Sequence, residues 1–440
     1  MRRTGMKIAA LAAVTAMAVT ACSGGTDEGT GAATSAAPGG KVELNFWTWA
    51  PGMEEIVDVW NAANPDIQVT VNTQDGGDPA VTKLLTAIQA GSGAPDLMQT
   101  EYQKIPTLVA SDALADISGV VSEDLAAHYA EGVWNGVTLG TDAVYGVPQD
   151  SGPMQLYYRE DIFEEMELEV PTTWDEYAEL AREVREKDPT KYLGTFSAND
   201  AGWFTGLVQQ AGASWWGIEG DSWTVSVADE ATLKVADYWG GLVEEGAINN
   251  KPMYTPEWNA ALNDGSEIAW LSAVWAPGVL AGNAGDTAGK WRMAPMPQWD
   301  AASPATGNWG GSATSVTSQS EHPAEAVKFI EWMNSSQEGV SLLADSGLYP
   351  ADIPGQAEAL SAPPEFMANQ EDFYELAGQT AETAGSFTFG PNVNVTYSAY
   401  NDEFAKAAEA KDAAAFRTAV ESMQQITVDD LVNSGFSVAE

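Results

Sequence analysis

Apolar and polar positions follow two different periods along the first part of the chain. Residues 42–49 and 67–73 alternate apolar and other side chains, which is typical of β-strands. Apolar residues over 53–60 and 81–88 recur at three- and four-residue spacing, as on one face of a helix. A short apolar run at 94–100 completes the series. This strand–helix–strand–helix–strand order predicts βαβ units and a parallel sheet.

The same mixture of periods returns later in the chain. The stretch PTTWDEYAELAREVREK predicts a strong helix, because Thr173 and Glu176 form a capping-box pattern at its start. We expect a second run of the same βαβ kind here, and a mostly helical chain from 401 to 432. The other predicted segments are an extended stretch at 145–161, a buried strand entering a turn and a helix at 267–282, a polar strand at 312–319 and a helix that begins near Pro323.

The first 21 residues have the three parts of a secretory signal peptide. Arg2, Arg3 and Lys7 make a positive end, an apolar run covers 8–19, and small residues follow. The apolar run is too short to cross ~30 Å of hydrocarbon as a helix. We predict that residues 1–21 are removed during ordinary secretion, because the residues after the two arginines fit the twin-arginine motif poorly.

The only cysteine of the chain comes directly after this segment. The sequence Val19-Thr20-Ala21-Cys22 resembles the bacterial lipoprotein lipobox, and the resemblance implies that Cys22 is lipidated. Residues 22–40 contain no large apolar side chain, so they predict a flexible tether. We therefore expect a protein held to the extracytoplasmic face of the cell membrane by a lipid anchor.

Composition and charge narrow the range of partners. With 63 acidic and 19 basic residues the net charge is −44, which repels polyanions, so nucleic acid is not expected as a partner. One cysteine and two histidines, His128 and His322, provide no Cys/His cluster, so we expect no metal and no cofactor. About 400 residues after the tether exceed the size of one core, so two lobes are expected.

Two further features bear on activity. The chain has 17 tryptophans, which predicts that some of them form a surface that binds flat, partly apolar ligands. The motifs of a serine-hydrolase elbow, a phosphate loop and a dinucleotide site are not found in the sequence. With 63 acids, a glycosidase-like pair of carboxylates arises by chance and has no weight. The sequence therefore favours a binding protein over an enzyme.

Four segments, in this order, resemble the extracellular solute-binding proteins of bacterial ABC transporters. The resemblance is strongest to the oligosaccharide-binding branch that includes the maltose-binding protein, and it runs from about residue 41 to the C-terminus. The segments are NFWTWAPGMEEIVDVWNAANPDIQVTV, GAPDLMQTEYQKIPTLVASDALADIS, YGVPQDSGPMQLYYREDIFEEMELEVPTTWDEYAEL and NWGGSATSVTSQSEHPAEAVKFIEWM.

This resemblance implies an α/β, two-lobed periplasmic-binding-protein-like fold with a hinge between the lobes and ligand in the cleft. It places the first crossing near Gln149-Asp150, the second near Gly310-Gly311 and the third near Gly347–Tyr349. Lobe 1 is then expected to hold 41–149 and 311–347, and lobe 2 to hold 150–310 and 348–440.

A neutral saccharide needs aromatic rings for its C–H faces, and carboxylates or amides for its hydroxyls. Trp47 and Trp49 end the first strand, and Glu101 and Tyr102 end a buried one. Asp150 lies at the first crossing. Since ligands bind outside the carboxyl ends of parallel strands, we predict contacts at these positions.

Six further contact residues are predicted after the first crossing. Trp309 precedes glycines, including Gly311, whose missing side chains allow close approach of a ligand. Trp203 and Trp258 are expected in loop-like surroundings of lobe 2. Trp275 and Tyr397 (or Tyr400 in its place) match positions where the resembled family often places sugar-stacking aromatics. By contrast, four tryptophans are expected on helices in the core: Trp60, Trp174, Trp239 and Trp332.

The leading hypothesis is a monomeric, lipid-anchored receptor that delivers a neutral oligosaccharide to the permease subunits of an ABC importer. The second is the same architecture with another solute, such as a polyamine, a peptide or a polyol. The third is a surface glycosidase.

Overall fold

The computed structural model describes residues 40–74, 76–220 and 222–439. The predicted signal peptide, the lipidation site Cys22 and the tether up to residue 39 lie outside these residues. Residues 41–439 form one compact unit.

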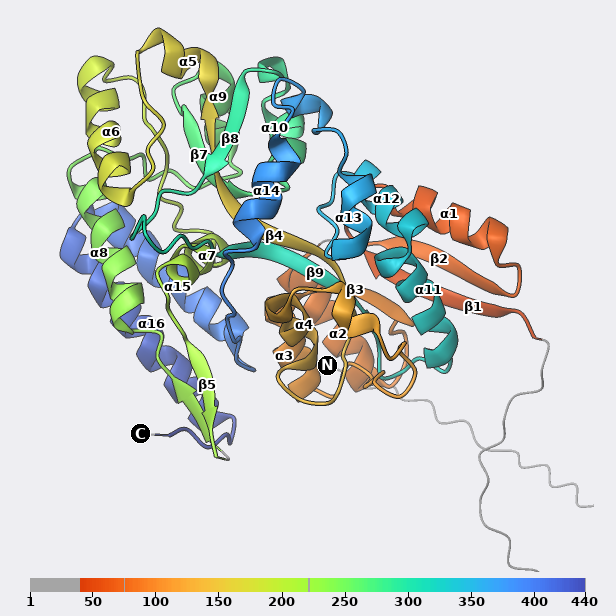
Figure 1. The fold of residues 1–440 in the computed structure, drawn as a ribbon. Coiled ribbons are helices and arrows are strands. Elements are labelled where there is room, and N and C mark those ends of the chain that lie inside the picture. The colour runs from red at the N-terminus through yellow and green to blue at the C-terminus, as the bar shows by residue number, and fades with distance from the viewer. Residues whose placement is uncertain (1–39, 75, 221, 440) are drawn as a thin grey trace, which may run out of the picture. The chain divides into compact units, whose positions relative to one another are not determined.

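The strands of this unit form one mixed sheet, in the order β2-β1-β3-β9-β4-β7 with β8 also paired to β4 (Figure 1). β1 is parallel to β2 and β3, whereas β9 is antiparallel to β3 and β4. The strands are β1 (Val42–Thr48), β2 (Ile67–Thr73), β3 (Leu97–Glu101), β4 (Val147–Arg159), β7 (Ala269–Ala273), β8 (Trp291–Pro295) and β9 (Asn308–Val316), and a separate hairpin pairs β5 (Trp216–Glu219) with β6 (Ser222–Val225).

The predicted parallel βαβ arrangement is confirmed for the first three strands, with helices between them. The expectation of a second run of the same kind is wrong, because β7 and β8 both pair antiparallel with β4. β4 is 13 residues long and pairs with β7 through residues 154–158 and with β8 through residues 155–159. β7 and β8 are therefore parallel to each other and are connected through the helix at 276–283, but the antiparallel β4 pairs with each of them. The periodicity identified the elements correctly, but their pairing depends on contacts distant in sequence.

Helices cover the sheet, and most of them begin as the sequence predicts. Thr173 and Glu176 form the predicted capping box of α6, with both reciprocal hydrogen bonds present. Pro323 is the first residue of α11, where its missing N–H costs no hydrogen bond. The helices are α1 (Met53–Ala63), α2 (Asp78–Ala90), α3 (Ile105–Ala110), α4 (Glu131–Thr138), α5 (Glu160–Glu165), α6 (Trp174–Lys187), α7 (Ala201–Gln210), α8 (Glu230–Glu244), α9 (Pro256–Asp264), α10 (Ala276–Asn283), α11 (Pro323–Ser335), α12 (Gln337–Asp345), α13 (Ile353–Ala359), α14 (Phe373–Ala381), α15 (Val393–Ala410) and α16 (Ala413–Asn433), with short 3₁₀ turns η1 (Tyr102–Lys104), η2 (Leu125–His128), η3 (Gly285–Thr287) and η4 (Glu365–Met367).

Buried apolar side chains gather in two regions of this unit. The large core region is a cluster drawn from 154–309 and 349–431, and the small core region consists of two clusters drawn from 44–147 and 313–351. The small core region buries Trp47 and Trp60. The large core region buries Trp174, Trp203, Trp215, Trp216, Trp239, Trp258, Trp270, Trp291 and Trp309.

Three segments connect the two core regions and lie side by side. Asp150 of β4 faces Ser312 of β9 on one side and Pro350 on the other. The Ser151 N–H donates to the Tyr349 carbonyl oxygen at 3.0 Å. The long strands β4 and β9 are therefore joined by a third, short strand-like segment where the chain passes between the core regions (Figure 1).

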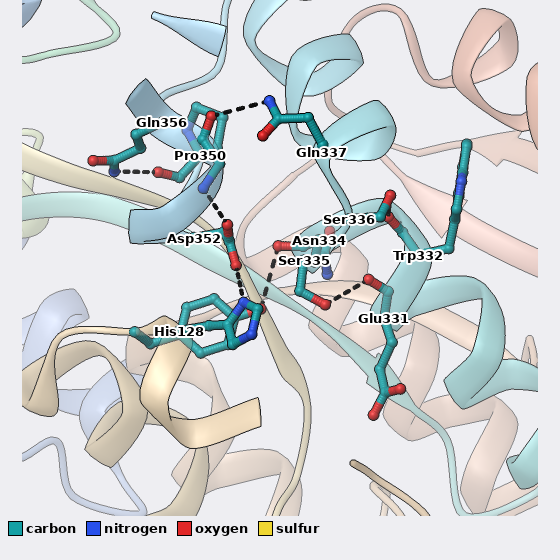
Figure 2. A network of polar contacts seen from close by, with 12 residues as sticks. His128, Glu331, Trp332, Asn334, Ser335, Ser336, Gln337, Pro350, Asp352 and Gln356 are labelled. Atoms are coloured by element: carbon teal, nitrogen blue, oxygen red, sulfur yellow. Dashed lines mark hydrogen bonds and ion pairs between the residues drawn. The ribbon is translucent and has the colours of Figure 1, made fainter. Parts of the chain in front are cut away.

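A polar network fixes this third segment (Figure 2). The side chain of Asp352 is 1% exposed, and one of its oxygens accepts a hydrogen bond from the Gly355 N–H at 2.7 Å, at the start of α13. Its other oxygen lies 2.5 Å from Nδ1 of His128, which belongs to η2. The Gln356 side-chain amide donates to the Pro350 carbonyl oxygen at 2.7 Å. The network thereby holds the crossing segment against a turn that precedes α4.

Candidate ligand-binding cleft

A groove lies between the two core regions and has a cavity volume of about 60 Å³. η1 and α4 line it from the side of the small core region, and α7, α15 and segment 385–389 line it from the side of the large one. The crossing strands contribute Ser151, Gly152 and Gly310. The groove therefore lies where the sequence analysis expected a ligand, between two separately packed parts of the chain.

Three carboxylates from different elements lie beside this groove, next to residues that line it, and share one electrostatic environment. Glu101 ends β3, Asp150 lies in β4, and Asp200 precedes α7, where its Oδ1 accepts a hydrogen bond from the Trp203 N–H at 2.9 Å. Burial raises the pKa of Glu101, against the opposing effect of the Lys104 ammonium. Burial also raises the pKa of Asp150 and of Asp200 to about 6, and the Glu101 carboxylate adds to both rises. Glu101 thus lies within electrostatic range of Asp200, although the two come from opposite sides of the groove.

Aromatic rings form a wall beside these acids. The rings of Trp275 and Trp309 meet edge to face at 4.7 Å, and the Trp275 indole N–H donates to the Trp309 carbonyl oxygen at 3.0 Å. Trp270 lies 6.0 Å from both. Tyr254 is 42% exposed, its ring centroid is 6.3 Å from that of Trp309, and its backbone has a φ of 64°. A bulky residue in this left-handed conformation is uncommon, and it places an accessible ring at the rim of the wall.

Glycines allow the elements around the groove to approach one another closely. A Cβ on Gly307 would lie 1.8 Å from the Gly206 carbonyl oxygen, and a Cβ on Gly152 would lie 2.2 Å from that of Trp309. No side chain fits at either place, so these glycines let α7 and β4 pack directly on the backbone of β9. Asp200, at the start of α7, is thereby held beside the Trp309 ring.

Several predicted site residues are brought together here. The Tyr102 hydroxyl donates to the Asp150 carbonyl oxygen at 3.0 Å, and a Cβ on Gly311 would lie 2.9 Å from the Tyr102 ring. Tyr397 lines the groove from α15, with the Lys104 ammonium 5.3 Å from its ring centroid. Its alternative, Tyr400, is fully buried.

Asp150 also has a structural role at this place. Its Oδ1 accepts hydrogen bonds from the backbone N–H of Ser312 at 2.8 Å and from the Ser312 hydroxyl at 2.5 Å. These bonds join two crossing strands, and the side chain is buried.

The two neighbouring tryptophans at the end of β1 have different surroundings. Trp47 is 5% exposed, packs in the small core region and has the Lys83 ammonium 4.4 Å from its ring centroid. Trp49 is half-buried, and its ring lies against Gly76. The next residue, Gly77, brings the same loop within about contact distance of Glu101, since a Cβ there would lie 4.0 Å from the carboxylate. Trp49 therefore lies near the acids, whereas Trp47 belongs to the core.

Trp203 and Trp258 were expected in loops, and this expectation is wrong. They lie on the first turns of α7 and α9. Each is 1% exposed. The Trp203 indole donates to the Leu271 carbonyl oxygen at 3.0 Å, and Trp258 packs edge to face on Trp270 at 5.1 Å. An amphipathic helix face explains both positions, because the side chain at the third residue of each helix turns inward.

The structure adds three residues that the sequence analysis did not select. Asp200 and Tyr254 have been described above. Lys104 is 4% exposed, with its ammonium 2.6 Å from Asp78 and 2.5 Å from the Asn394 side-chain oxygen. Asp200 carried a weak signal, since an Asp before a helix is a common N-cap. The backbone conformation of Tyr254 and the long-range partners of Lys104 have no local sequence signature.

Within the described residues, no group of three or more His, Cys, Asp or Glu side chains is arranged to hold a metal ion. The helices in that part of the chain include none with the length and apolar character that a membrane crossing requires.

Comparison with known proteins identifies the family. Residues 47–340 match the family described as "Bacterial extracellular solute-binding protein". The chain belongs to this family, whose members bind solutes and are not enzymes, and the α/β periplasmic-binding-protein fold expected from the sequence is confirmed.

Three relatives illustrate the range of similarity. An arabinooligosaccharide-binding protein of Halalkalibacterium halodurans is 27% identical over 68% of this chain and 68% of its own. The structure of the galacto-N-biose-/lacto-N-biose I-binding protein of Bifidobacterium longum, in complex with lacto-N-biose, covers 92% of this chain and 100% of its own, with 29% identity and a TM-score of 0.81. An uncharacterized lipoprotein of Streptomyces antibioticus is 30% identical over 35% of this chain and 36% of its own.

Proposed function

We propose that this protein captures a neutral oligosaccharide in the groove between its two core regions and delivers it to an ABC importer. The observation that carries the proposal is that Asp200 and the Trp309 ring lie together against Gly202, which lines the groove, with the Trp275 ring packed on that of Trp309. Carboxylates accept hydrogen bonds from sugar hydroxyls, and indole rings cover the C–H face of a sugar ring. Relatives with saccharide ligands, an arabinooligosaccharide and lacto-N-biose, support this ligand class.

We further propose that binding operates by closure of two lobes, 41–149 with 311–347 and 150–310 with 348–440. The buried clusters support these boundaries, because they change between Val147 and Met154, between Trp309 and Ala313, and near Tyr349. A ligand that contacts both lobes shifts the population toward the closed arrangement, which a permease can then distinguish.

Two direct contacts support a closed arrangement of the groove. Besides the Lys104–Asn394 contact, the Thr107 hydroxyl donates to the Pro391 carbonyl oxygen at 2.8 Å. Each joins η1 or α3 to the start of α15, so each is made only when the two sides of the groove meet. Their free energy adds to that of the ligand.

We also propose that Cys22 carries a lipid that holds the receptor at the extracytoplasmic face of the membrane. The lipobox-like sequence supports this, as does the similarity to a Streptomyces lipoprotein. Metabolic labelling with radioactive palmitate should label the wild-type chain and leave Cys22→Ser unlabelled. Labelling of Cys22→Ser at the wild-type level would contradict the anchor.

Calorimetric titration with a panel of di- to tetrasaccharides, including arabinooligosaccharides and lacto-N-biose, tests the ligand class. We expect at least one dissociation constant near micromolar, about −8 kcal/mol. Glu101→Gln, which preserves the shape of the side chain, should weaken that affinity at least tenfold because it halves the acceptor capacity.

Spermidine in the same titration tests the alternative of a cationic solute. This alternative needs a test because the three carboxylates beside the groove would attract a cation. Tight binding of spermidine, with no heat from any saccharide, would overturn the proposal. Release of reducing ends from any saccharide would instead reveal turnover.

A further inference from the structure

A second, larger groove continues from the first one. Its cavity volume is about 450 Å³, between α3 and α4 on one side and the β5–β6 hairpin with segment 386–391 on the other. Tyr102, Phe387 and Phe389 line both grooves. A ligand bound in the first groove therefore has a continuous path into this second space, which we call the apolar groove.

The walls of the apolar groove are less polar than those of the first groove, which include Gln103, Gln209 and Asn308. The walls of the apolar groove include Val109, Leu139, Ile218, Trp223 and Phe436. Charged residues make up 19% of the chain, yet none lines either groove. The polar side chains of the apolar groove are those of Tyr102, Asn135, Ser386 and Thr388.

Some of these apolar side chains are exposed to a degree that needs an explanation. Ile218 is 65% exposed and Phe436 is 37% exposed, on two segments that are joined by a bridge between Trp223 and Val438. An exposed apolar concavity with few polar partners marks a binding surface more often than a folding requirement.

The chemistry of the walls limits what the apolar groove can hold. A sugar ring carries hydroxyls around its edge, and each one moved out of water without a partner costs free energy. The few polar groups here lack the glutamine amides of Gln103 and Gln209 that line the first groove. An aromatic or aliphatic group, which needs no hydrogen bonds, fits these walls and gains free energy in proportion to its buried area.

We propose that the apolar groove binds an apolar substituent on the anomeric carbon of the saccharide, so that the preferred ligand is an aryl or alkyl glycoside. This inference rests on the proposed function, because the sugar part occupies the first groove. Continuity of the two grooves favours one ligand over two, and the groove walls come from the same two sides whose closure would enclose the sugar.

Pairs of glycosides that share one sugar test the inference. Methyl, p-nitrophenyl and n-octyl β-glycosides of galactose, arabinose and lactose would be titrated calorimetrically against the full protein. For the sugars that bind, we expect the p-nitrophenyl and octyl glycosides to bind about 10- to 100-fold more tightly than the methyl glycoside, since each buries on the order of 100 Å² or more. Equal affinities within each set would overturn the inference while leaving the proposed function intact.

Variants assign the effect to the groove. The double substitution Ile218→Ser with Phe436→Ser removes two exposed apolar side chains and should reduce the advantage of the apolar glycosides at least threefold, with the methyl glycoside unchanged. Ile353→Ser is the matched control, because Ile353 is 52% exposed on α13 and does not line the groove.

The remaining outcomes also decide the matter. An undiminished advantage in the double variant would place the apolar group elsewhere and overturn the inference. If cells with the double variant lose sugar uptake while its affinity for every glycoside is unchanged, the groove is a contact surface for the transporter and the inference is overturned. If no saccharide or glycoside of any kind binds, the proposed function fails and the inference fails with it.

Discussion

The two core regions use tryptophan very differently. The large one buries nine and has three more packed against it, Trp223, Trp275 and Trp299. The small one buries Trp47 and Trp60 and has two more packed against it, Trp134 and Trp332. A high tryptophan content predicted a ligand-gripping surface, but most of these rings build a core. The wall of the groove is the edge of that core, where Trp275 and Tyr254 remain accessible.

The buried tryptophans of the large core region should therefore govern stability. Trp239 is 1% exposed and its ring lies within about 6 Å of those of Trp174, Tyr177 and Trp203. Trp239→Ala should lower the free energy of unfolding by about 3–5 kcal/mol, because it leaves a large cavity. Thermal or denaturant unfolding measures this.

The control lies at the rim of the small core region. Trp332 is only half-buried, so Trp332→Ala should cost clearly less than Trp239→Ala. An equal or greater loss for Trp332→Ala would contradict the contrast between the two regions.

The large core region also buries a carboxyl group that should make its stability depend on pH. Glu267 is 1% exposed, accepts a hydrogen bond from the Asn249 side chain at 3.1 Å, and its pKa is raised by burial to about 8. Since the folded state holds this proton more tightly than the unfolded chain, the free energy of unfolding should fall as the pH rises from about 4.5 to about 8.

The substitution Glu267→Gln tests this dependence. Equilibrium unfolding is measured at pH 5 and at pH 8. At pH 8 the free energy of unfolding of the variant should exceed that of wild type by about 3 kcal/mol. The difference should shrink at pH 5, where the wild-type carboxyl is mostly protonated in the folded state. A difference that does not change with pH would rule out this carboxyl as the cause.

The two tryptophans at the end of β1 offer a matched pair on the side of the small core region. Trp49→Ala should weaken saccharide binding about tenfold, roughly 1.4 kcal/mol, with a small loss of stability, because its ring lies near Glu101 and outside the buried clusters. Trp47→Ala should lower the melting temperature and leave the intrinsic affinity of the folded protein nearly unchanged. Calorimetric binding and thermal unfolding of both variants distinguish the ligand-binding role from the core-packing role. If Trp47→Ala loses affinity and Trp49→Ala loses stability, the two roles are the reverse of those expected.

The smallest effect is expected at the contact between the two sides of the groove. Asn394→Ala removes the Lys104–Asn394 contact without touching the proposed ligand wall. It should weaken saccharide binding about two- to fivefold, roughly 0.5–1 kcal/mol, because the closed arrangement loses one polar contact. Asn401→Ala, at an exposed position on the same helix, is the control. Affinities that coincide for the two variants would show that this contact does not contribute to closure.

The sequence predicted local elements well, because their signals are local. The capping box of α6, the proline at the start of α11 and the βαβ order of the first 60 residues of the domain all depend on neighbours in the chain. The pairing of β7 and β8 with β4 was missed, since antiparallel ladders between distant strands leave no periodic trace.

The site was predicted in part for the same reason. Tyr102 was selected from its place at the end of a strand, and it lines the groove. Glu101 and Trp309 lie next to the lining residues Tyr102 and Gly310, and Trp309 itself is buried. Trp203 and Trp258 were assigned to loops, but each lies on the inner face of a first helical turn. Tyr254 depends on an unusual backbone angle, which no residue pattern reveals.

The edge-to-face chain that runs from Trp258 through Trp270 to Trp275 and Trp309 has a practical consequence. Indoles this close exchange excitation energy, so light absorbed deep inside the domain can be emitted from rings at the groove. The intrinsic tryptophan fluorescence should therefore report ligand binding at the groove. A bound ligand that carries a nitrophenyl group would quench the fluorescence of more rings than the few that it touches.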